Sequence, residues 1–545
     1  MAAYTAKRFG GSTPRMAPHL LGAENAGVAL DCKLWHGNLA SWREPRLERT
    51  LAAGIGTTFL YDCCWLDFSG CVDIAVGPVN CRKLFLTGLL DYPAVMEFAP
   101  TEINRCAATT RRLGVPCGDA PLSAVYGAGG ALRDTEGRSY AYQYVNAAGE
   151  RGALSQTTPT VQARDGQTVV LSGWATPDAT WGITHVQIYR TVSGYQSPGK
   201  ESGNVLDTTW MLVGKVLVGA GFFIDSATNE LLIEALQEDI APPPPAELKG
   251  IIHIESMNAL AGFVGKRIYY SENNSYHQWP YFQDLDDNIL GITESNGLIY
   301  VATDGAPYVI TGVADCQNAG CREVVRLPVV LPMAGGGNRR MAATPQGAVY
   351  PGHDGLVLLA GRAVPGLLTH PLYAADDWQA LAPNTIVPVV HGGSLFVFGQ
   401  GGAFVLKLPG GTEAGWPLDM HSSLSDTNVR QAQVTRNGAL YLRLADGRVV
   451  EWDRGNTLRP HKWVSPELVT DTPVNFGAAH LQNVNGSESV TITVDRRQPF
   501  ERDVLSPRVF RLPTWMLGTR WRVTLEGTAT VSLFSMATSM KELGS

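Results

Sequence analysis

Apolar and polar positions alternate along almost the whole chain in the short pattern of β-strands. Four segments repeat one layout, in which an apolar strand, a glycine-containing turn and a second apolar strand follow one another. This layout predicts a β-hairpin. The four segments are residues 299–312, 348–361, 395–408 and 440–453.

The four predicted hairpins recur at a nearly constant interval. They start at positions 299, 348, 395 and 440, so the intervals are 49, 47 and 45 residues. A period of ~40–50 residues is typical of one four-stranded blade of a β-propeller. A β-sandwich with evenly spaced hairpins is the alternative. Weaker copies are seen at 260–272 and far upstream at 84–98, where strand-like runs at 57–68 and 72–79 precede them.

A group of unrelated strands interrupts this repeat. Five short strand-like runs are predicted between residues 140 and 225, with turns between them, which indicates an inserted β-sandwich of fibronectin or immunoglobulin type. The insertion ends at residues 241–248, where four consecutive prolines predict a stiff connector. Two helices are expected, at 101–114 and 229–239, from their capping residues and apolar spacing.

These patterns predict an all-β protein with a discontinuous propeller. Residues 1–125 are expected to hold an N-terminal segment and the first blades, and residues 126–245 the inserted sandwich. Residues 246–460 are expected to hold the remaining blades, which gives six to seven in total. The alternating strands of residues 461–545 predict a C-terminal β-sandwich or a closing blade, ending in a frayed tail.

Composition agrees with a chain rich in turns. Glycine (59) and proline (33) make up 92 of 545 residues, about 17%, against a typical ~12%. A hydrophobic fraction of 45% is too high for a disordered chain, and the turn content excludes a helical bundle or coiled coil.

Charge and the N-terminus narrow the function classes. The formal net charge is −7, whereas a protein that grips nucleic acid is usually basic. No run of apolar residues is long enough for a membrane-spanning helix, and no apolar signal region follows the basic N-terminus. We therefore expect synthesis in a cytosol and no membrane anchor.

The nine cysteines give no metal signature. Seven lie between Cys32 and Cys117, and the other two are Cys316 and Cys321. No C-x-x-C pair occurs, so the strong zinc motifs are missing. Buried free thiols are expected, with a Cys316–Cys321 loop disulfide as the alternative.

Catalytic motifs are also missing from the sequence. There is no P-loop, no H-E-x-x-H and no G-x-S-x-G, and the eleven histidines are scattered singly. The acidic run from Asp284 to Asn288 could bind calcium but lacks the EF-hand glycine and distal glutamate. We expect no enzyme activity, no cofactor and no bound metal, and we interpret the run as a solvated loop.

Several phrases of the sequence together resemble the nozzle proteins of short-tailed bacteriophages, also called tail tubular protein B. The resemblance covers roughly residues 30–460 and extends to two shorter C-terminal phrases. The phrases are residues 34–49, 112–121, 140–155, 186–194 and 270–280, followed by 463–469 and 510–513.

The resemblance implies a structural function. Such nozzles are propeller-based subunits, six around the tail axis, that extend the DNA channel below the head-to-tail adaptor ring. Implied partners are the other subunits of the homo-hexamer, the adaptor ring, tail fibres and a tail needle or tip. Genomic DNA would pass through the channel without sequence-specific binding. The implied location is the virion tail, assembled in the bacterial host cytoplasm.

The channel suggests a role for acidic residues. An arginine-lined bore would retain DNA, whereas a net-acidic chain allows a bore that repels phosphate. Asp284, Asp286 and Asp287 are the candidate lumen residues. Two other functions remain open: a propeller adhesin that binds host glycan, and a propeller glycosidase.

Overall fold

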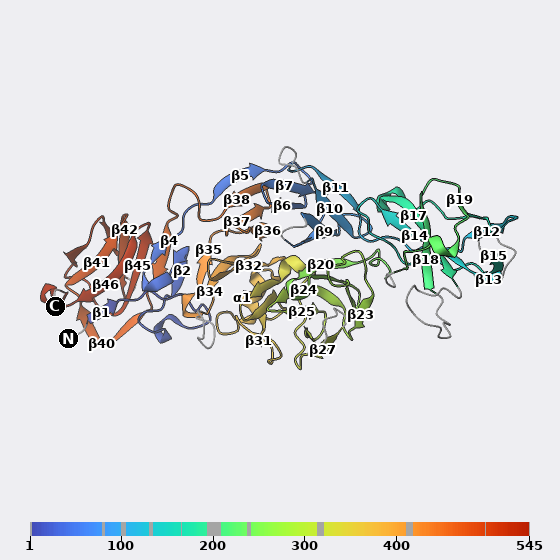
Figure 1. Cartoon of the computed structure of the whole chain (residues 1–545). Helices are drawn as coiled ribbons and strands as arrows, with labels where there is room; N and C mark the ends of the chain where they lie inside the picture. The colour runs from blue at the N-terminus through green and yellow to red at the C-terminus, as the bar shows by residue number, and fades with distance from the viewer. Residues whose placement is uncertain are drawn as a thin grey trace. The chain divides into compact units, whose positions relative to one another are not determined.

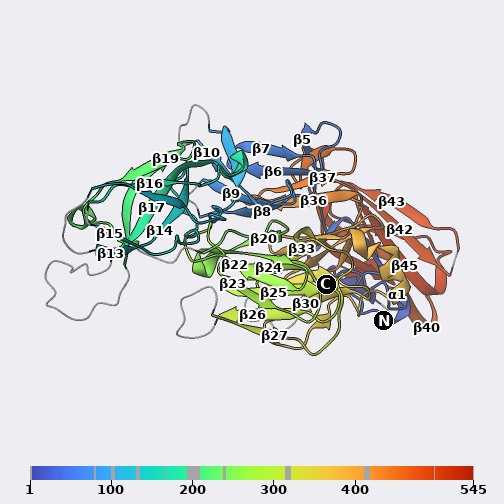
Figure 2. The same ribbon diagram turned by 90° about the vertical axis from the view of Figure 1, so that its right-hand side faces the viewer.

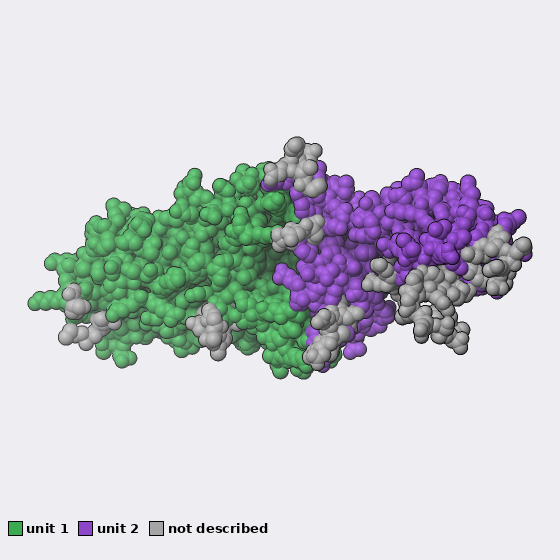
Figure 3. Space-filling view, viewed as in Figure 1, with its two compact units in different colours: residues 1–70, 287–311, 324–545 green, residues 71–286, 312–323 purple. Residues whose placement is uncertain are grey.

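The computed structural model describes most of the chain, and it divides into two compact units (Figure 3). Unit 1 comprises residues 1–70, 287–311 and 324–545, and unit 2 comprises residues 71–286 and 312–323. The described residues are 3–78, 82–99, 105–129, 135–164, 166–192, 209–236, 241–312, 321–409, 418–495 and 497–543.

The fold is nearly all β. Among the described residues the one α-helix is α1 (Ala375–Ala380), which the sequence analysis did not predict. The helix expected at 101–114 is wrong where it is described, because Ala108–Arg112 is strand β11. Its β-branched Thr109 and Thr110 pair with the neighbouring strand, so the sheet overrides the helical spacing. The helix expected at 229–239 is reduced to a 3-10 turn at Asn229–Leu231.

Unit 1 contains four four-stranded antiparallel meanders, which are β-propeller blades (Figure 1). Their first strands neighbour one another in order, β24 beside β28, β28 beside β32 and β32 beside β36. The first blade is β24 (Ile289–Ser295), β25 (Leu298–Thr303), β26 (Tyr308–Gly312) and β27 (Arg322–Arg326), and the second is β28 (Ala342–Thr344), β29 (Gly347–Pro351), β30 (Leu356–Leu359) and β31 (Gly366–Leu367). The third is β32 (Val387–His391), β33 (Ser394–Phe398), β34 (Ala403–Lys407) and β35 (Ser422–Leu424), and the fourth is β36 (Val429–Val434), β37 (Leu440–Leu444), β38 (Arg448–Glu451) and β5 (Arg46–Thr50).

The repeat predicted from sequence is confirmed. Each of the four predicted hairpins is the central strand pair of a blade: β25–β26, β29–β30, β33–β34 and β37–β38. These strands are the most apolar because both of their faces are covered by neighbouring blades, as in β33, where all five residues are buried.

The fourth blade of unit 1 is completed by a strand from the other end of the chain. β5 pairs with β38 as its outermost strand, so residues 46–50 close a sheet whose other strands begin at residue 429. A hairpin of β6 (Thr57–Tyr61) and β7 (Cys64–Phe68) follows β5 and forms a separate two-stranded sheet.

Unit 2 contains two further blades. They are formed by β8 (Asp73–Val76), β9 (Lys83–Thr87), β10 (Ala94–Phe98) and β11, and by β20 (Lys249–Ile254), β21 (Ala259–Val264), β22 (Arg267–Tyr270) and β23 (Tyr281–Asp284). β8 lies beside β20. The predicted hairpins at 84–98 and 260–272 are again the central strand pairs of these blades.

The inserted region of unit 2 lies between these two blades in the chain. Its main strands form two three-stranded sheets around one core that includes Tyr140, Tyr142, Val169 and Ile188 (Figure 2). This is a sandwich-like arrangement, and its fibronectin or immunoglobulin type stays a prediction. One sheet is β12 (Ser123–Tyr126), β16 (Val169–Ser172) and β19 (Phe222–Asp225), and the other is β14 (Tyr140–Asn146), β17 (Ile183–Val192) and β18 (Thr209–Leu217), with a small pair of β13 (Thr135–Arg138) and β15 (Val161–Arg164).

The C-terminal region forms a second two-sheet assembly within unit 1. One sheet has the order β1-β46-β41-β44, and the facing strands are β39, β40, β45, β42 and β43. Trp463, Trp521, Phe476 and Phe534 lie in the shared core. The strands are β1 (Ala3–Ala6), β39 (His461–Val464), β40 (Leu468–Asn475), β41 (Ala478–Val484), β42 (Glu488–Val494), β43 (Phe500–Val504), β44 (Arg508–Arg511), β45 (Leu517–Gly527) and β46 (Thr530–Ala537).

The N-terminal segment that was expected within residues 1–125 packs against the C-terminal strands. Residues 3–41, here called the N-terminal arm, belong to the C-terminal core, and β1 runs beside β46 in Figure 1. The arm lacks the continuous apolar runs that form the strands of a blade. Its scattered apolar side chains pack instead into the core between the two C-terminal sheets. Eight arm residues are in that core: Tyr4, Ala6, Phe9, Ala26, Ala29, Cys32, Leu34 and Leu39.

One short strand of the arm connects blade and C-terminal region. β2 (Val28–Leu30) pairs in parallel with β35 of the third blade and antiparallel with β39. The blade and the C-terminal strands are thereby parts of one ten-stranded sheet.

Candidate functional site

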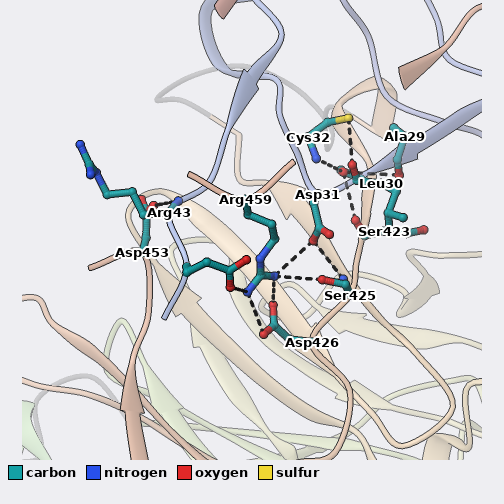
Figure 4. A network of polar contacts seen from close by, with 12 residues as sticks. Ala29, Leu30, Asp31, Cys32, Arg43, Ser423, Ser425, Asp426, Asp453 and Arg459 are labelled. Atoms are coloured by element: carbon teal, nitrogen blue, oxygen red, sulfur yellow. Dashed lines mark hydrogen bonds and ion pairs between the residues drawn. The ribbon is translucent and has the colours of Figure 1, made fainter. Parts of the chain in front are cut away.

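A buried polar network lies where the arm, a blade and the C-terminal region meet (Figure 4). Arg459, just before β39, donates from Nη1 to Asp31 (3.3 Å) and to Ser425 (3.2 Å). Its two terminal nitrogens also bind both oxygens of Asp426, and Nη2 reaches Glu44 at 3.3 Å. One guanidinium thus holds together three segments that are far apart in the sequence.

Arg459 keeps its positive charge in this position. Burial alone would lower the pKa of Arg459, but the hydrogen bonds and negative charge of Asp426, with Asp31 and Glu44 beyond it, raise it above its ordinary value. The guanidinium also lies 5.3 Å from the ring centre of Trp452. A cation held by buried carboxylates and an aromatic face has no free position for a substrate, so the network acts as a structural joint.

A second group has the composition of a serine–histidine–acid triad. Ser41 Oγ lies 2.9 Å from His461 Nδ1, and His461 Nε2 lies 3.0 Å from Glu488 Oε1. His461 and Glu488 face each other across Gly527, whose missing side chain leaves the space, because a Cβ there would lie 2.6 Å from Glu488 Oε2. The side chains of His461 and Glu488 are fully buried, so this triad connects the arm to the C-terminal region and is closed to substrate.

A third group repeats the serine–histidine contact on the blade side of the arm. Ser12 Oγ lies 3.0 Å from His421 Nδ1, and Tyr373 OH lies 2.7 Å from His421 Nε2. The rings of Tyr373 and Phe404 pack against the imidazole. Burial lowers the pKa of His421 to about 4, with a small opposing effect of the Ser12 backbone, so this histidine is neutral at pH 7.

In unit 2 a charged network joins the inserted region to the blade of β8–β11. Glu150 pairs with Arg111 at 3.0 Å and with Lys83 at 3.6 Å, and Glu97 pairs with the same two cations at 3.0 and 2.7 Å. Burial raises the pKa of Glu150, but Arg111, Asn146 and the other neighbours outweigh it and leave the pKa below its ordinary value.

An arginine stack reinforces this joint. Arg112, the next residue of β11, lies 4.0 Å from the ring centre of Trp181 in the inserted region and 5.0 Å from that of Tyr92. A planar guanidinium between two aromatic rings contributes both dispersion and cation–π attraction.

The inserted region has its own buried ion pair. Arg190 and Asp225 are fully buried and lie 2.7 Å apart, and Tyr140 OH donates to the same carboxylate at 2.8 Å. Arg190 also donates to the carbonyl of Ala227 and to Asn229. These bonds attach the segment that follows β19 to the sheet that contains β14 and β17.

Exposed apolar side chains gather on the outer face of the sheet β12-β16-β19. Val125, Val170 and Ile224 form one cross-strand row, and Phe222 follows on the same face two residues before Ile224. Val125, Phe222 and Ile224 are 61%, 58% and 49% exposed, respectively. Such a group is unusual on a protein that functions without a partner.

The three aspartates proposed for a channel are not one cluster. Asp284 ends β23, the outermost strand of its blade, and forms a bidentate pair with Arg267 at 2.6 and 2.9 Å. This hydrogen bond lowers the pKa of Asp284. Asp287 accepts hydrogen bonds from Tyr308 OH and the backbone of Ala306, inside its own blade. Asp286 is exposed. Whether any of them faces a channel stays a prediction.

An exposed aromatic ring lies beside Asp284. Phe282 is 52% exposed, and the guanidinium of Arg267 lies 4.1 Å from its ring centre. Tyr269 lies next to it, with ring centres 6.1 Å apart. The sequence analysis did not identify this group, because its members come from two strands and have no common motif.

The cysteines differ from the expectation of buried free thiols. Cys64, Cys106 and Cys321 are disulfide-bonded, which removes their sulfur atoms as metal ligands. Cys32 is buried, whereas Cys63 and Cys71 are exposed and Cys117 is intermediate. Cys316 lies outside the described residues, so the alternative of a Cys316–Cys321 bond is not tested by its own geometry.

Comparison with known proteins adds little beyond this geometry. No family model matches the chain, and no curated protein matches it. Within the described residues, no helix is long and apolar enough to cross a membrane.

Solved structures give only distant likenesses. PorZ of Porphyromonas gingivalis, a bacterial surface component of the type-IX secretion system, is 13% identical with a TM-score of 0.28, covering 92% of this chain and 86% of its own. BamB of Moraxella catarrhalis is 13% identical with a TM-score of 0.24 (62% and 99% covered). An exo-β-1,3-galactanase of Phanerochaete chrysosporium is 10% identical with a TM-score of 0.17 (85% and 95% covered). At these TM-scores the likenesses carry no argument, and the propeller assignment rests on the sheets described above.

Proposed function

We propose that this chain is a non-enzymatic structural subunit of a virion tail, a nozzle subunit of the kind found in short-tailed bacteriophages. Six copies would surround the tail axis and extend the DNA channel below the adaptor ring. The proposal starts from the sequence resemblance. It is supported by the packing and ion-pair contacts that residues of the resembling phrases make in the structure.

The observation that carries the proposal is that these phrases supply the joints of the molecule. Trp42, from phrase 34–49, is buried against Phe396 and Trp452 of the third and fourth blades. Arg112 and Glu150, from phrases 112–121 and 140–155, join blade and inserted region. Trp279, from phrase 270–280, is buried in the core of unit 2. A structural subunit requires residues that maintain its shape rather than residues that catalyse a reaction.

The apolar face of the inserted region supports an assembled state. A sheet face with Val125, Phe222 and Ile224 exposed is costly for a free monomer, because apolar surface in water is unfavourable at roughly 25 cal/mol per Å². In the proposed nozzle the inserted region is the peripheral docking module. Asp284 and Asp286, which are exposed, are then the candidates for the channel wall, whereas Asp287 serves its own blade.

Oligomeric state tests this proposal directly. The purified full-length chain, alone and with its adaptor ring, should give six-fold rings in negative-stain images and a hexamer mass by native mass spectrometry. A chain that stays monomeric at micromolar concentration, and does not form a ring on the adaptor, would overturn it.

A second candidate function is glycan binding by the propeller. It is favoured by the exposed ring of Phe282 beside the paired Arg267 and Asp284. An aromatic face can stack on a sugar ring, while a guanidinium and a carboxylate can bind its hydroxyl groups. A glycan array probed with the wild-type chain and with Phe282→Ala tests it. Binding that is lost in the variant supports this function, and an array without binding excludes it.

A further inference from the structure

The N-terminal arm contacts two histidines, His421 directly before β35 of the third blade and His370 shortly after β31 of the second blade. Ser12 donates its backbone N–H to the carbonyl of His421 at 2.9 Å, and its hydroxyl lies against the imidazole. Three residues later, the backbone N–H of Arg15 donates to the carbonyl of Leu372 at 3.0 Å, and Arg15 Nη1 donates to the carbonyl of His370 at 2.6 Å. Both attachment points therefore place an arm residue directly against a histidine of the propeller.

Among the described residues, no anion acts on His421. Its ring nitrogens face two hydroxyl groups, those of Ser12 and Tyr373, and the rings of Tyr373 and Phe404 pack against the imidazole. Asp419, two residues away in the sequence, is paired with Arg8 at 2.7 Å on the surface, and the charge of Asp377 acts on Tyr373. An imidazolium formed in this position would be buried without a counter-ion.

The other end of the arm is held in different surroundings. His461, which lies against Ser41, faces the carboxylate of Glu488 at 3.0 Å. His421, in contrast, is buried between two hydroxyl groups and two aromatic rings.

From this difference we propose that the N-terminal arm is an acid-released latch, whose blade-side part around residues 10–26 detaches from the third blade when His421 takes up a proton. The C-terminal end of the arm, around Ser41, stays attached. The device does not depend on the proposed nozzle function, since it concerns the contacts of a single chain.

The sign of the pH dependence follows from linkage. The pKa of His421 is about 4 when the arm is bound, against an ordinary value of 6.5 when the arm is released. The released state therefore binds more protons between these two values, and the attachment is complete above pH 6.5 and weakens as the pH falls. From pH 7.5 to pH 5 the opening equilibrium should increase about 30-fold from His421 alone.

Hydrogen exchange of the full-length chain tests the latch. Protection of the backbone N–H groups of Ser12 and Arg15, corrected for the intrinsic pH dependence of exchange, is expected to fall by about 30-fold or more between pH 7.5 and 5. Protection of Val464 in β39 should stay constant. Equal protection of the arm at both pH values would overturn the proposal.

A pair of variants assigns the effect to the histidine. His421→Gln, which cannot take up a proton, should lose most of the pH dependence of arm protection. His480→Gln, at a half-buried position of β41 in the same unit, should retain all of it. If His421→Gln keeps the full pH dependence, the latch is not controlled by His421 and the proposal is wrong. If that variant does not fold, the wild-type profile still decides the matter.

Discussion

Single buried polar side chains connect distant parts of this chain. Arg459 binds Asp31 and Asp426, and His421 and His461 each bind a serine of the arm. In the sequence these residues are scattered singly. Their partners in the arm lie 409 to 428 positions away, so no local pattern could reveal these pairs.

Removal of Arg459 should be costly at the residue scale. Arg459→Ala leaves Asp31 and Asp426 buried without their cation, and breaking a buried pair typically costs about 3–5 kcal/mol. We expect a loss of this size in the free energy of unfolding, measured by urea titration of unit 1 signals.

The matched control is an arginine in an exposed pair. Arg448→Ala removes a contact with Asp446 in which both side chains are more than half exposed, and it should leave the unfolding free energy nearly unchanged. Equal effects of the two substitutions would contradict the structural role assigned to Arg459.

The space that Gly527 leaves beside His461 and Glu488 gives a second prediction at the residue scale. Gly527→Ala would place a methyl group 2.6 Å from Glu488 Oε2 and 3.0 Å from the Glu488 Cα, beside the fully buried side chains of His461 and Glu488. We expect a destabilisation of roughly 1–3 kcal/mol by thermal unfolding. Gly366→Ala, in β31, meets open space and should change little.

At the scale of elements, the hairpin of β6 and β7 is held by side chains in place of a paired strand. Gln431 accepts from the backbone N–H of Thr58 and donates to its carbonyl, at 3.1 and 2.7 Å. Gln433 does the same for Leu60, with both bonds 2.8 Å long. The two amides of β36 thus replace the backbone of a neighbouring strand, which explains how a two-stranded sheet persists at this position.

The double variant Gln431→Ala and Gln433→Ala should therefore loosen this hairpin selectively. Each lost hydrogen bond is worth about 1 kcal/mol, so backbone exchange at Thr58 and Leu60 should accelerate markedly while exchange in β33 does not. Gln482→Ala, an exposed position of β41, is the control. Unchanged exchange at Thr58 in the double variant would refute the interpretation.

On the scale of the whole molecule, the two ends of the chain fold as one region. The arm supplies β1, which pairs with β46, and eight residues of the C-terminal core. The arm is therefore a structural part of the C-terminal region, and the first strand of the chain that joins a four-stranded blade sheet is β5 (Arg46–Thr50).

Deletion of residues 2–41 should consequently unfold the C-terminal region. Loss of Phe9, Leu34 and Leu39 exposes Trp463 and its neighbours, and loss of β1 leaves β46 with an open edge. We expect aggregation or loss of the near-UV circular dichroism of the buried tryptophans. Removal of residues 539–545, which are largely exposed where described, should be tolerated.

The sequence by itself determined the all-β fold and the position of every blade hairpin. Strand periodicity and glycine turns are local, and each blade repeats them within about 45 residues, so the pattern is readable without any tertiary contact. The insertion was visible for the same reason, because its strands break the period and a proline run ends it.

Only the tertiary structure decided where the ends of the chain pack and which partners the buried polar side chains bind. Thr109 and Thr110 became strand residues because β10 offered them partners, against their helical spacing. The arm joined the C-terminal core, and Arg459, His421 and His461 acquired their partners, through contacts between residues hundreds of positions apart. Such contacts depend on which surfaces meet after the blades have formed, and local periodicity contains no information about that.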